Sequence, residues 1–343
     1  MEERPTEATD VRMPGIVPST WLDYADERGL PRDVILTEAD LVREEAENFV
    51  SGVPLLKLAM LAQAVIRRVD VPSIGIDIGW RMPLTSFGNV GRAMLSSATF
   101  LEALQVCQRF WQLVGPDLIL HVAMHEGLVV ATISTLPTVQ GQFRRVTIDA
   151  AMATFYRGVQ TLLSDAVDRT EIWFDYPAPE HAEEIRKRIP VARFGMPIAQ
   201  CRVPIELLQH KLPLASAVGR RSAMQLCEIE ERTAGLQDRL SGRVQMRLGF
   251  DASGYPTLEQ TAAAFHMTER TLRRRLQDEG TTYSGLLDEA RRRDAVRLLW
   301  NPELDVADIA ERLGYSDGAN FTRAFRKWTG VAPSHFRAMQ TGG

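Results

Sequence analysis

Cysteine is scarce in this sequence: the 343 residues include three, Cys107, Cys201 and Cys227. Their odd number and wide spacing exclude a disulfide framework, and no C-x-x-C pair is present to hold a metal. Such cysteine usage is typical of a reducing compartment, where thiols stay free. We therefore expect a cytoplasmic protein without disulfide bonds.

Long apolar runs are also missing. The longest, Leu118–Met124 and Leu128–Ile133, fall far short of the ~20 residues that a membrane helix requires. The sequence opens with the acidic and polar residues 1–5, which do not resemble a secretory signal. We expect neither a membrane span nor export.

The motifs of common enzyme classes are absent from the sequence. It contains no G-x-x-x-x-G-K-[ST] phosphate loop and no G-x-S-x-G nucleophile elbow. The glycines of Gly75–Gly79 lack the third glycine and the strand–helix context of a dinucleotide fingerprint. His125-Glu126 lacks the second histidine of the H-E-x-x-H zinc motif. We expect no catalytic activity, no cofactor and no metal site.

Net charge is low as well, at −4, which by itself argues against binding to a polyanion. The acidic excess lies before residue 249, because residues 249–343 contain 13 basic and 13 acidic side chains. Within this neutral end, Thr268–Gln277 carries four arginines and one glutamate, and Gly318–Lys327 carries three bases and no acid. Two short basic helices in a balanced domain fit a local site for nucleic acid.

Periodicity and composition divide residues 1–254 into three parts. Residues 1–20 are polar, contain proline and show no period, so we expect a disordered leader. Residues 21–212 combine helical runs with an apolar, β-branched hairpin pattern over 118–134, and predict an α+β domain. Residues 213–254 are interpreted as a helical connector that ends in a loop.

Residues 255–340 contain an internal repeat. In the aligned copies, Leu258-x-x-Thr261-Ala262-x-x-Phe265-His266-Met267-Thr268 matches Val306-x-x-Ile309-Ala310-x-x-Leu313-Gly314-Tyr315-Ser316, 48 residues later. Gly314 and its counterpart His266 are residue types that tolerate a left-handed turn. Thr268 and Asp317 are residue types that cap helices. Each copy therefore predicts a helix-turn-helix motif, and the domain is predicted to be all-α, with the two motifs joined by a linker helix.

The second helix of each copy has an inward and an outward face. Leu272 and Leu276 point inward, as do Phe321 and Phe325 in the second copy. The opposite side would face a DNA major groove. The outward positions, at i, i+3, i+4 and i+7, are Arg270, Arg273, Arg274 and Gln277 in the first copy and Ala319, Thr322, Arg323 and Arg326 in the second. Arginine can pair with guanine, whereas Ala319 is too short to hydrogen-bond a base, so we expect the first helix to read more of the sequence.

A helical run, Tyr283–Asn301, joins the two copies and would span ~25–28 Å at 1.5 Å per residue. One turn of B-DNA is ~34 Å, so one chain could place both recognition helices in successive major grooves, on subsites about 10 bp apart. Two interpretations remain for residues 291–293, three arginines on this helix. We favour a salt bridge from one of them to Asp288, Glu289 or Asp294, whereas the family resemblance described next implies a packing or phosphate role for some of them.

The second copy carries a specific signature. It reads Ile309-Ala310-x-x-Leu313-Gly314-Tyr315-Ser316-Asp317, then Asn320-Phe321-x-Arg323-Ala324-Phe325-Arg326-Lys327-Trp328-x-Gly330-x-x-Pro333-x-x-Phe336-Arg337. This pattern closely resembles AraC/XylS-type transcription regulators over about residues 255–340. One departure is Ala319, where a serine or another polar residue is frequent. The resemblance adds Asn320 and Lys327 to the candidate DNA contacts, and implies double-stranded promoter DNA and RNA polymerase as partners.

The first part of the chain carries a second resemblance. Its residues are Gly88-x-x-Gly91, Ser96-x-x-Thr99-x-x-Glu102-Ala103-Leu104 and Phe194-Gly195-x-Pro197. They are similar to the arabinose-binding-like effector domain of the VirS/OruR-type subgroup. The resemblance implies transcription control tuned by a small molecule, without naming the molecule.

Five residues are candidates for an effector pocket: Trp111, His121, Arg144, Arg145 and Tyr156. An arginine pair could hold a carboxylate effector. The alternative is that each residue serves the fold or the surface and binds no effector. A histidine on a strand commonly finds hydrogen-bond partners among its neighbours, and two arginines before a helix can be solvated.

Three hypotheses for function remain, and we favour an effector-responsive transcription regulator, in particular an activator. A ligand that prefers one arrangement of the first domain would shift the population of DNA-competent molecules, with residues 213–254 carrying the shift by homodimerisation or by release of the DNA-binding domain. The alternative is a constitutive dimeric regulator without a ligand. An enzyme fused to a DNA-binding tail is disfavoured, because no catalytic constellation is visible.

Overall fold

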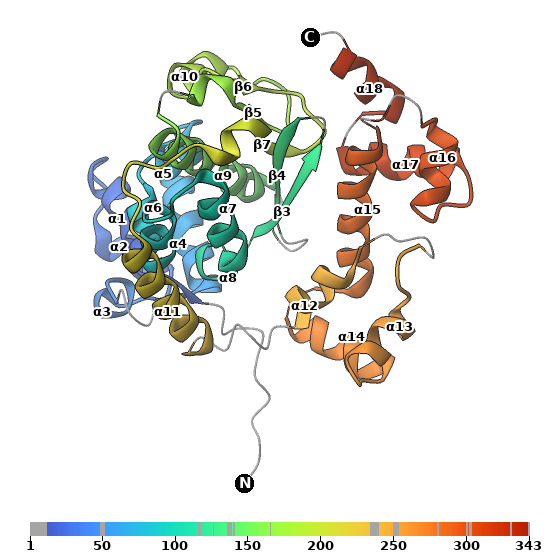
Figure 1. Cartoon of the computed structure of the whole chain (residues 1–343). Helices are drawn as coiled ribbons and strands as arrows, with labels where there is room; N and C mark the ends of the chain where they lie inside the picture. Colours follow the sequence, from blue (N-terminus) through green and yellow to red (C-terminus); the bar gives the residue numbers. More distant parts are fainter. Residues whose placement is uncertain are drawn as a thin grey trace. The chain divides into compact units, whose positions relative to one another are not determined.

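The computed structural model divides into two compact units, one built mainly from residues 9–237 and the other from residues 238–343 (Figure 1). The first unit is mixed α/β and the second is helical, which confirms the predicted fold class. The structure describes residues 12–48, 52–115, 118–125, 127–135, 139, 141–164, 166–233, 240–249, 254–279, 281–299, 301, 304–329 and 331–341.

The first unit begins with a helical layer around a core of its own. Buried side chains of Trp21, Leu22, Tyr24, Leu61 and Val65 help to fill this core. Two short antiparallel strands join the start of the layer to the residues before its longest helix. The elements are β1 (Arg12–Met13), α1 (Ile16–Asp26), α2 (Arg32–Glu38), α3 (Arg43–Ala46), β2 (Val53–Pro54), α4 (Leu55–Arg68) and α5 (Ile74–Trp80).

A five-stranded sheet forms the second layer of this unit. Its order is β3-β4-β7-β5-β6, and the neighbours are antiparallel except for the parallel pair β5 and β6. The hairpin predicted over residues 118–134 is confirmed, with Leu118 opposite Thr135. The strands are β3 (Leu118–His125), β4 (Leu128–Thr135), β5 (Glu171–Trp173), β6 (Ala192–Arg193) and β7 (Ala199–Pro204).

Helix α9 (Gly141–Leu162) joins the two layers, with α5 packed against it and β4 and β7 also in contact with it. Glycine permits the approach of α5. A Cβ atom at Gly75 would lie 2.6 Å from the carbonyl oxygen of Val146, and one at Gly79 only 2.1 Å from that of Ala150. These two glycines therefore serve helix packing. The other elements around the sheet are η1 (Leu84–Phe87), α6 (Gly88–Leu95), α7 (Phe100–Arg109), α8 (Trp111–Val114), η2 (Val167–Arg169), α10 (Ala182–Arg188) and η3 (Ile205–Gln209).

The structure corrects the predicted disordered leader over residues 1–20. Strand β1 pairs with β2, and α1 starts at Ile16. The helix forms because Val17, Trp21 and Tyr24, at i, i+4 and i+7, make a stripe that is buried in the core. Residues 1–11 lie outside the described part of the chain.

The structure also corrects the predicted single connector over residues 213–254. Helix α11 (Ala217–Thr233) belongs to the first unit, because Ala223 and Cys227 pack into a small core with residues of α6 and α7. Helix α12 (Leu240–Arg247) belongs to the second unit, where Leu240 and Val244 are buried. Residues 234–239, between the two helices, lie outside the described residues.

The second unit realises the sequence repeat as two helix-turn-helix motifs joined by α15. His266 and Gly314 both adopt left-handed backbone conformations, with φ of 54° and 75°, which confirms the predicted turns. The inward residues Leu272, Leu276 and Phe325 are fully buried. The elements after α12 are α13 (Leu258–Ala264), α14 (Glu269–Asp278), α15 (Tyr283–Leu299), α16 (Val306–Arg312), α17 (Gly318–Thr329) and α18 (Pro333–Thr341).

Candidate DNA-binding surface and ligand cavity

The first recognition helix, α14, is fixed at its start by a side-chain cap. The Oγ1 atom of Thr268 accepts a hydrogen bond from the backbone N–H of Thr271 at 3.2 Å, as its residue type predicts. One helix earlier, Thr257 and Gln260 form a reciprocal capping box at the start of α13. Both helices of the motif therefore have defined N-termini.

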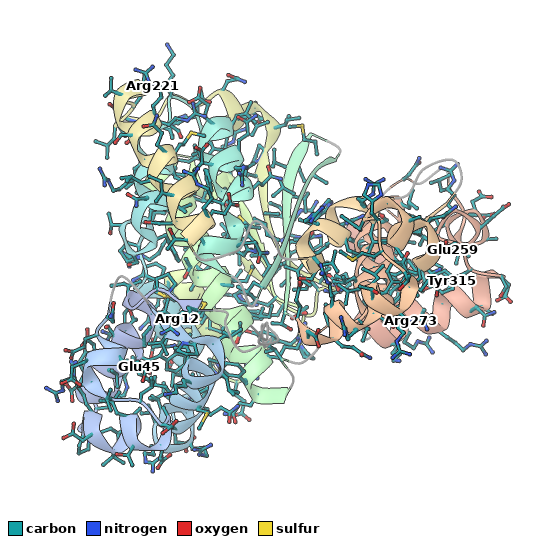
Figure 2. The ribbon with its side chains drawn as sticks, turned by 90° about the horizontal axis from the view of Figure 1, so that it is seen from below. Arg12, Glu45, Arg221, Glu259, Arg273 and Tyr315 are labelled. Atoms are coloured by element: carbon teal, nitrogen blue, oxygen red, sulfur yellow. The ribbon has the colours of Figure 1, made fainter. Side chains whose placement is uncertain are left out.

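Helix α14 presents one apolar and one basic face. Leu272 and Leu276 are buried, and the predicted outward residues are all exposed: Arg270, Arg273, Arg274 and Gln277. Figure 2 shows Arg273 pointing away from the helices. Its guanidinium lies 3.2 Å from the Glu269 carboxylate, an exposed pair that contributes little to stability. We name the four exposed residues the reading face of α14.

The second recognition helix, α17, has a denser cap. The Oδ1 atom of Asp317 accepts a hydrogen bond from the Asn320 backbone N–H at 2.7 Å, and this bond lowers the pKa of the Asp317 carboxyl. The Asn320 side chain donates to Ser316 Oγ at 2.6 Å and to Asp317 Oδ2 at 2.9 Å, and accepts from Arg323. Asn320 therefore stabilises the helix start in the unbound protein.

The other predicted residues of α17 differ in exposure. Thr322 is half-buried, whereas the remaining four are exposed: Ala319, Arg323, Arg326 and Lys327. Phe321 and Phe325, on the opposite face, are fully buried with their ring centroids 5.7 Å apart. The exposed face of α17 thus carries three cations around one small side chain.

The arginines of α15 pair within the second unit. Arg292 lies 2.9 Å from the Glu289 carboxylate, and Arg293 lies 2.9 Å from that of Asp294, which confirms the salt-bridge interpretation. Arg293 also donates to the Leu248 carbonyl at 3.0 Å, so it fastens α12 to α15. Arg291 donates from Nε to the Leu313 carbonyl at 3.1 Å. Arg291 and Arg293 therefore tie α15 to neighbouring segments of the unit, whereas Arg292 pairs within α15.

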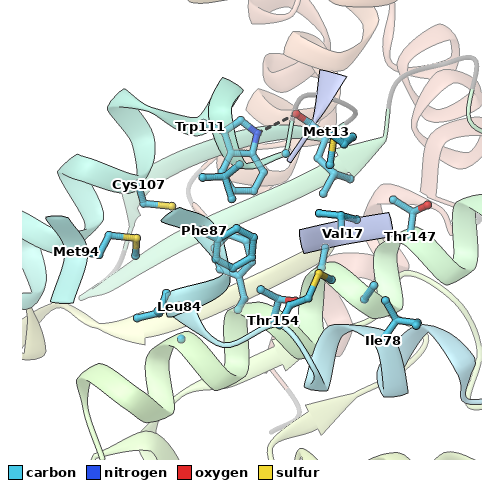
Figure 3. A pocket seen from close by; sticks show the side chains of 18 of the residues that line it. Met13, Val17, Ile78, Leu84, Phe87, Met94, Cys107, Trp111, Thr147 and Thr154 are labelled. Carbon is cyan, nitrogen blue, oxygen red and sulfur yellow. Dashed lines mark hydrogen bonds between the residues drawn. The ribbon is translucent and has the colours of Figure 1, made fainter. Parts of the chain in front are cut away.

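A cavity of about 170 Å³ lies inside the first unit. Residues from α1, α4, α5, α6, α7, α8 and α9 line it, together with Met13 of β1. Met94 and Cys107 lie on one side, and Val17 and Ile78 on the other (Figure 3). Burial raises the pKa of the Cys107 thiol to about 12, so the thiol stays neutral at physiological pH.

Of the five predicted effector residues, Trp111 lines this cavity. Its Nε1–H donates to the Leu118 carbonyl at 2.8 Å, drawn as a dashed line in Figure 3. Tyr156 is buried beside Trp80, with ring centroids 6.3 Å apart, and is not among the lining residues. His121 lies on the edge strand β3 and also does not line the cavity. The structure does not bring the five residues together.

The predicted arginine pair, Arg144 and Arg145, belongs to a polar cluster at the start of α9. Arg144 pairs with the buried carboxylate of Asp175, and the guanidinium of Arg145 lies 4.4 Å from the Tyr176 ring centroid. The Tyr176 hydroxyl donates to Asp149, whose pKa is raised to about 7 by burial. Arg144 therefore pairs with an acidic group and Arg145 packs on an aromatic ring, and neither is among the described residues that line the cavity.

Sequence reasoning missed the cavity-lining residues of the N-terminal segment, which include Met13, Val17 and Trp21. The helical spacing of Val17 and Trp21 was the available signal. It was weak, because Pro14 and Pro18 interrupt this short stretch and suggest irregular structure.

Other kinds of site find no support in the described part of the chain. No group of three or more His, Cys, Asp or Glu side chains there is arranged to hold a metal ion. None of the helices that the structure describes is both long enough and apolar enough to cross a membrane. The three cysteines are free and buried.

Comparisons with known proteins agree with this arrangement. The family model of the arabinose-binding domain of AraC transcription regulators matches residues 29–212, and a helix-turn-helix domain model matches residues 261–339. The ornithine utilization regulator of Pseudomonas aeruginosa is 30% identical over 338 residues, covering 98% of this chain and 99% of that protein. An uncharacterized HTH-type transcriptional regulator of Mycobacterium tuberculosis is 30% identical over 333 residues, covering 95% and 96%. The crystal structure of the transcriptional regulator CdpR from Pseudomonas aeruginosa aligns at 24% identity and a TM-score of 0.48, covering 93% and 97%.

Proposed function

The chain belongs to the AraC family of DNA-binding transcription regulators, and on this premise we propose that a small molecule in the cavity of the first unit controls its binding to promoter DNA. The observation that carries the proposal is that α6 and α7 line the cavity and also hold α11. Met94, Leu104 and Cys107 face the cavity, whereas Ala93 and Val106 contact the core that contains α11. A ligand that changes the position of α6 or α7 therefore acts on α11.

Helix α11 is well placed to pass on such a change, because only residues 234–239 separate it from α12 of the DNA-binding unit. It is clamped to α7 by Glu231, whose two carboxylate oxygens accept from Arg109 at 2.8 and 3.0 Å. A ligand that binds more tightly to one position of α11 would shift the population of DNA-competent molecules. Without such a ligand, the same chain would act as a constitutive regulator.

DNA recognition is proposed to use the reading face of α14 for bases and the exposed cations of α17 mainly for phosphates, because arginine matches both and Ala319 reads at most a methyl group. Helix α15 has 17 residues, or about 25 Å at 1.5 Å per residue. With the width of each motif added, this length fits recognition helices in successive major grooves, about 34 Å apart.

The direct test is selection of bound duplexes from a random library by the full-length protein. We expect enriched duplexes with two short conserved elements whose centres are about 10 bp apart, one of them more strongly conserved than the other. An enriched site with a single element would contradict the two-motif reading. A library that emerges without enrichment would contradict sequence-specific binding altogether.

Three parts of the proposal rest on other grounds. Activation of transcription and contact with RNA polymerase are supported by the family resemblance. A cytoplasmic location is supported by the three free, buried cysteines, which suit a reducing compartment. Homodimerisation is supported by the surface of α11.

The proposed dimer surface is an apolar stripe on α11. Val218, Leu226 and Ile229 are 69%, 38% and 49% exposed and lie along one side of the helix, and Leu214, just before the helix, is 64% exposed. The buried Ala223 and Cys227 lie on a different side, which packs on the first unit. A stripe of this kind on a soluble protein commonly marks a protein interface.

Charge along α11 favours an antiparallel pair of two copies. Arg221 and Glu228 are both exposed and lie seven residues apart, so they flank the same edge of the apolar stripe. In an antiparallel pair, Arg221 of each copy would lie beside Glu228 of the partner subunit, twice in each dimer. Figure 2 shows Arg221 projecting from the unit.

Charge reversal tests this dimer. We expect Arg221→Glu to raise the dimer dissociation constant by about tenfold or more, because two pairs of ~0.2–1 kcal/mol each become repulsive. Glu228→Arg should act alike, and the double variant should regain wild-type affinity. Analytical ultracentrifugation measures the dimer dissociation constants. The control is Lys187→Glu, which makes the same change of charge at an exposed position on α10. A double variant that dimerises no better than either single variant would rule out the antiparallel pairing.

A further inference from the structure

None of the described residues that line the cavity in the first unit carries a charged side chain. Its walls consist of aliphatic, aromatic and sulfur-containing residues, two threonines, three alanines and two glycines. We propose that the cavity binds a small, uncharged, apolar molecule, of the size of a substituted benzene, rather than a sugar or a carboxylate. This inference rests on the proposed function only in treating the cavity as the effector site.

The polar groups on the walls are largely engaged with the protein. Trp111 Nε1–H donates to the Leu118 carbonyl at 2.8 Å, Thr154 Oγ1 donates to the Gly79 carbonyl at 3.2 Å, and Thr147 Oγ1 donates to the Phe143 carbonyl at 2.9 Å. A sugar would leave several hydroxyl groups without partners there. Each such loss costs free energy, and an unpaired buried carboxylate costs far more.

Volume sets the size of the molecule. An apolar cavity of ~150 Å³ in another protein stays dry and binds benzene. The cavity here, at about 170 Å³, leaves room for little more than a ring with one or two small substituents. A long hydrocarbon chain would have to extend out through the open side of the cavity or move its walls apart.

Aromatic side chains on the walls favour an aromatic guest. Trp111 and Phe155 lie with ring centroids 5.8 Å apart at an interplanar angle of 50°, and both line the cavity. Phe87, Phe100 and Phe143 are also lining residues. Tilted and edge-to-face contacts between rings add stabilisation beyond the area they bury.

The experiment uses the full-length protein and three probes: toluene, benzoate and arabinose. We expect toluene to raise the melting temperature of the first unit by about 2–4 °C and to saturate, because it binds the folded state alone. Benzoate and arabinose at the same concentration should leave it unchanged. Ligand-observed NMR reports binding of each probe independently.

Variants of Cys107 locate the effect. Cys107→Phe should fill the cavity and abolish the toluene shift, whereas Cys107→Ala, which changes the same position without filling it, should retain the shift. Ala151→Leu fills the cavity from α9 and gives a second test if Cys107→Phe does not fold.

Three results would overturn the inference. They are a shift with arabinose or benzoate that Cys107→Phe abolishes, a toluene shift of equal size in both filled variants, or no binding of toluene up to its solubility. The proposed function is tested separately, by measuring affinity for the selected DNA site with and without toluene. Binding of toluene with unchanged DNA affinity would contradict effector control through this molecule class and leave the ligand assignment standing.

Discussion

Phe325→Ala is expected to lower the stability of the second helix-turn-helix motif by about 3–5 kcal/mol, the usual cost of removing a large buried aromatic side chain. Phe325 is fully buried, and its ring centroid lies 5.7 Å from that of Phe321 and 5.8 Å from that of Phe336. It therefore links α17 to α18 and supports the helix that presents Arg323 and Arg326. Loss of this support should abolish specific DNA binding.

Hydrogen exchange of the full-length protein measures this loss of stability in the second motif, as a lower free energy of opening of α16, α17 and α18. Arg326→Ala, the exposed neighbour, is the matched control and should change stability by no more than ~0.5 kcal/mol while weakening DNA binding. If Phe325→Ala lowers the opening free energy by less than about 1 kcal/mol, the aromatic cluster is not the core that holds α17.

Arg274→Ala is expected to weaken binding to the selected DNA site by about 1–3 kcal/mol and to relax the preference at one base pair. Arg274 is exposed on α14 and lies on the side opposite to Leu272 and Leu276, whose side chains are buried. An arginine in this position can donate two hydrogen bonds to guanine O6 and N7 in the major groove. The variant therefore loses the free energy of this contact on the selected DNA site, but not on random DNA.

Arg275→Ala is the matched control for this prediction. It removes the same charge from the same helix, but Arg275 is exposed toward one flank and lies outside the reading face. It should cost less, and equally on the selected site and on random DNA. DNA titrations at two salt concentrations distinguish a base contact from a phosphate contact. Loss of a phosphate contact also lowers the slope of log affinity against log salt concentration by about one. Equal losses for Arg274→Ala on both DNAs would assign it to phosphate.

Local signals explain why the DNA-binding unit could be predicted from the sequence. The turn at His266 and Gly314, the cap at Thr268 and the inward leucines all depend on residues within one or two helical turns of each other. Repetition of the pattern 48 residues later added a second, independent observation. The same locality placed the arginines of α14 on an exposed face.

Long-range contacts explain why the effector residues could not be predicted in the same way. Arg144 finds its partner in Asp175, 31 residues away, and the sequence holds no sign of that pairing. The cavity combines elements from strand β1, at Met13, to helix α9, at Leu162, so its apolar walls look like ordinary core positions in each element taken alone. A pair of arginines suggested a carboxylate, whereas packing turned both toward buried groups.

Because α11 and α12 are anchored in different units, the position of a crossover matters when homologous regulators recombine their domains. Ala223 and Cys227 complete a core of the first unit, and Leu240 and Val244 complete a core of the second. A crossover at residue 212 or 254 would deprive one half of its own helix. Recombination at residues 234–239 would transfer each half with its core complete, so this short stretch is where a sensory half and a DNA-reading half can be shuffled as inherited modules.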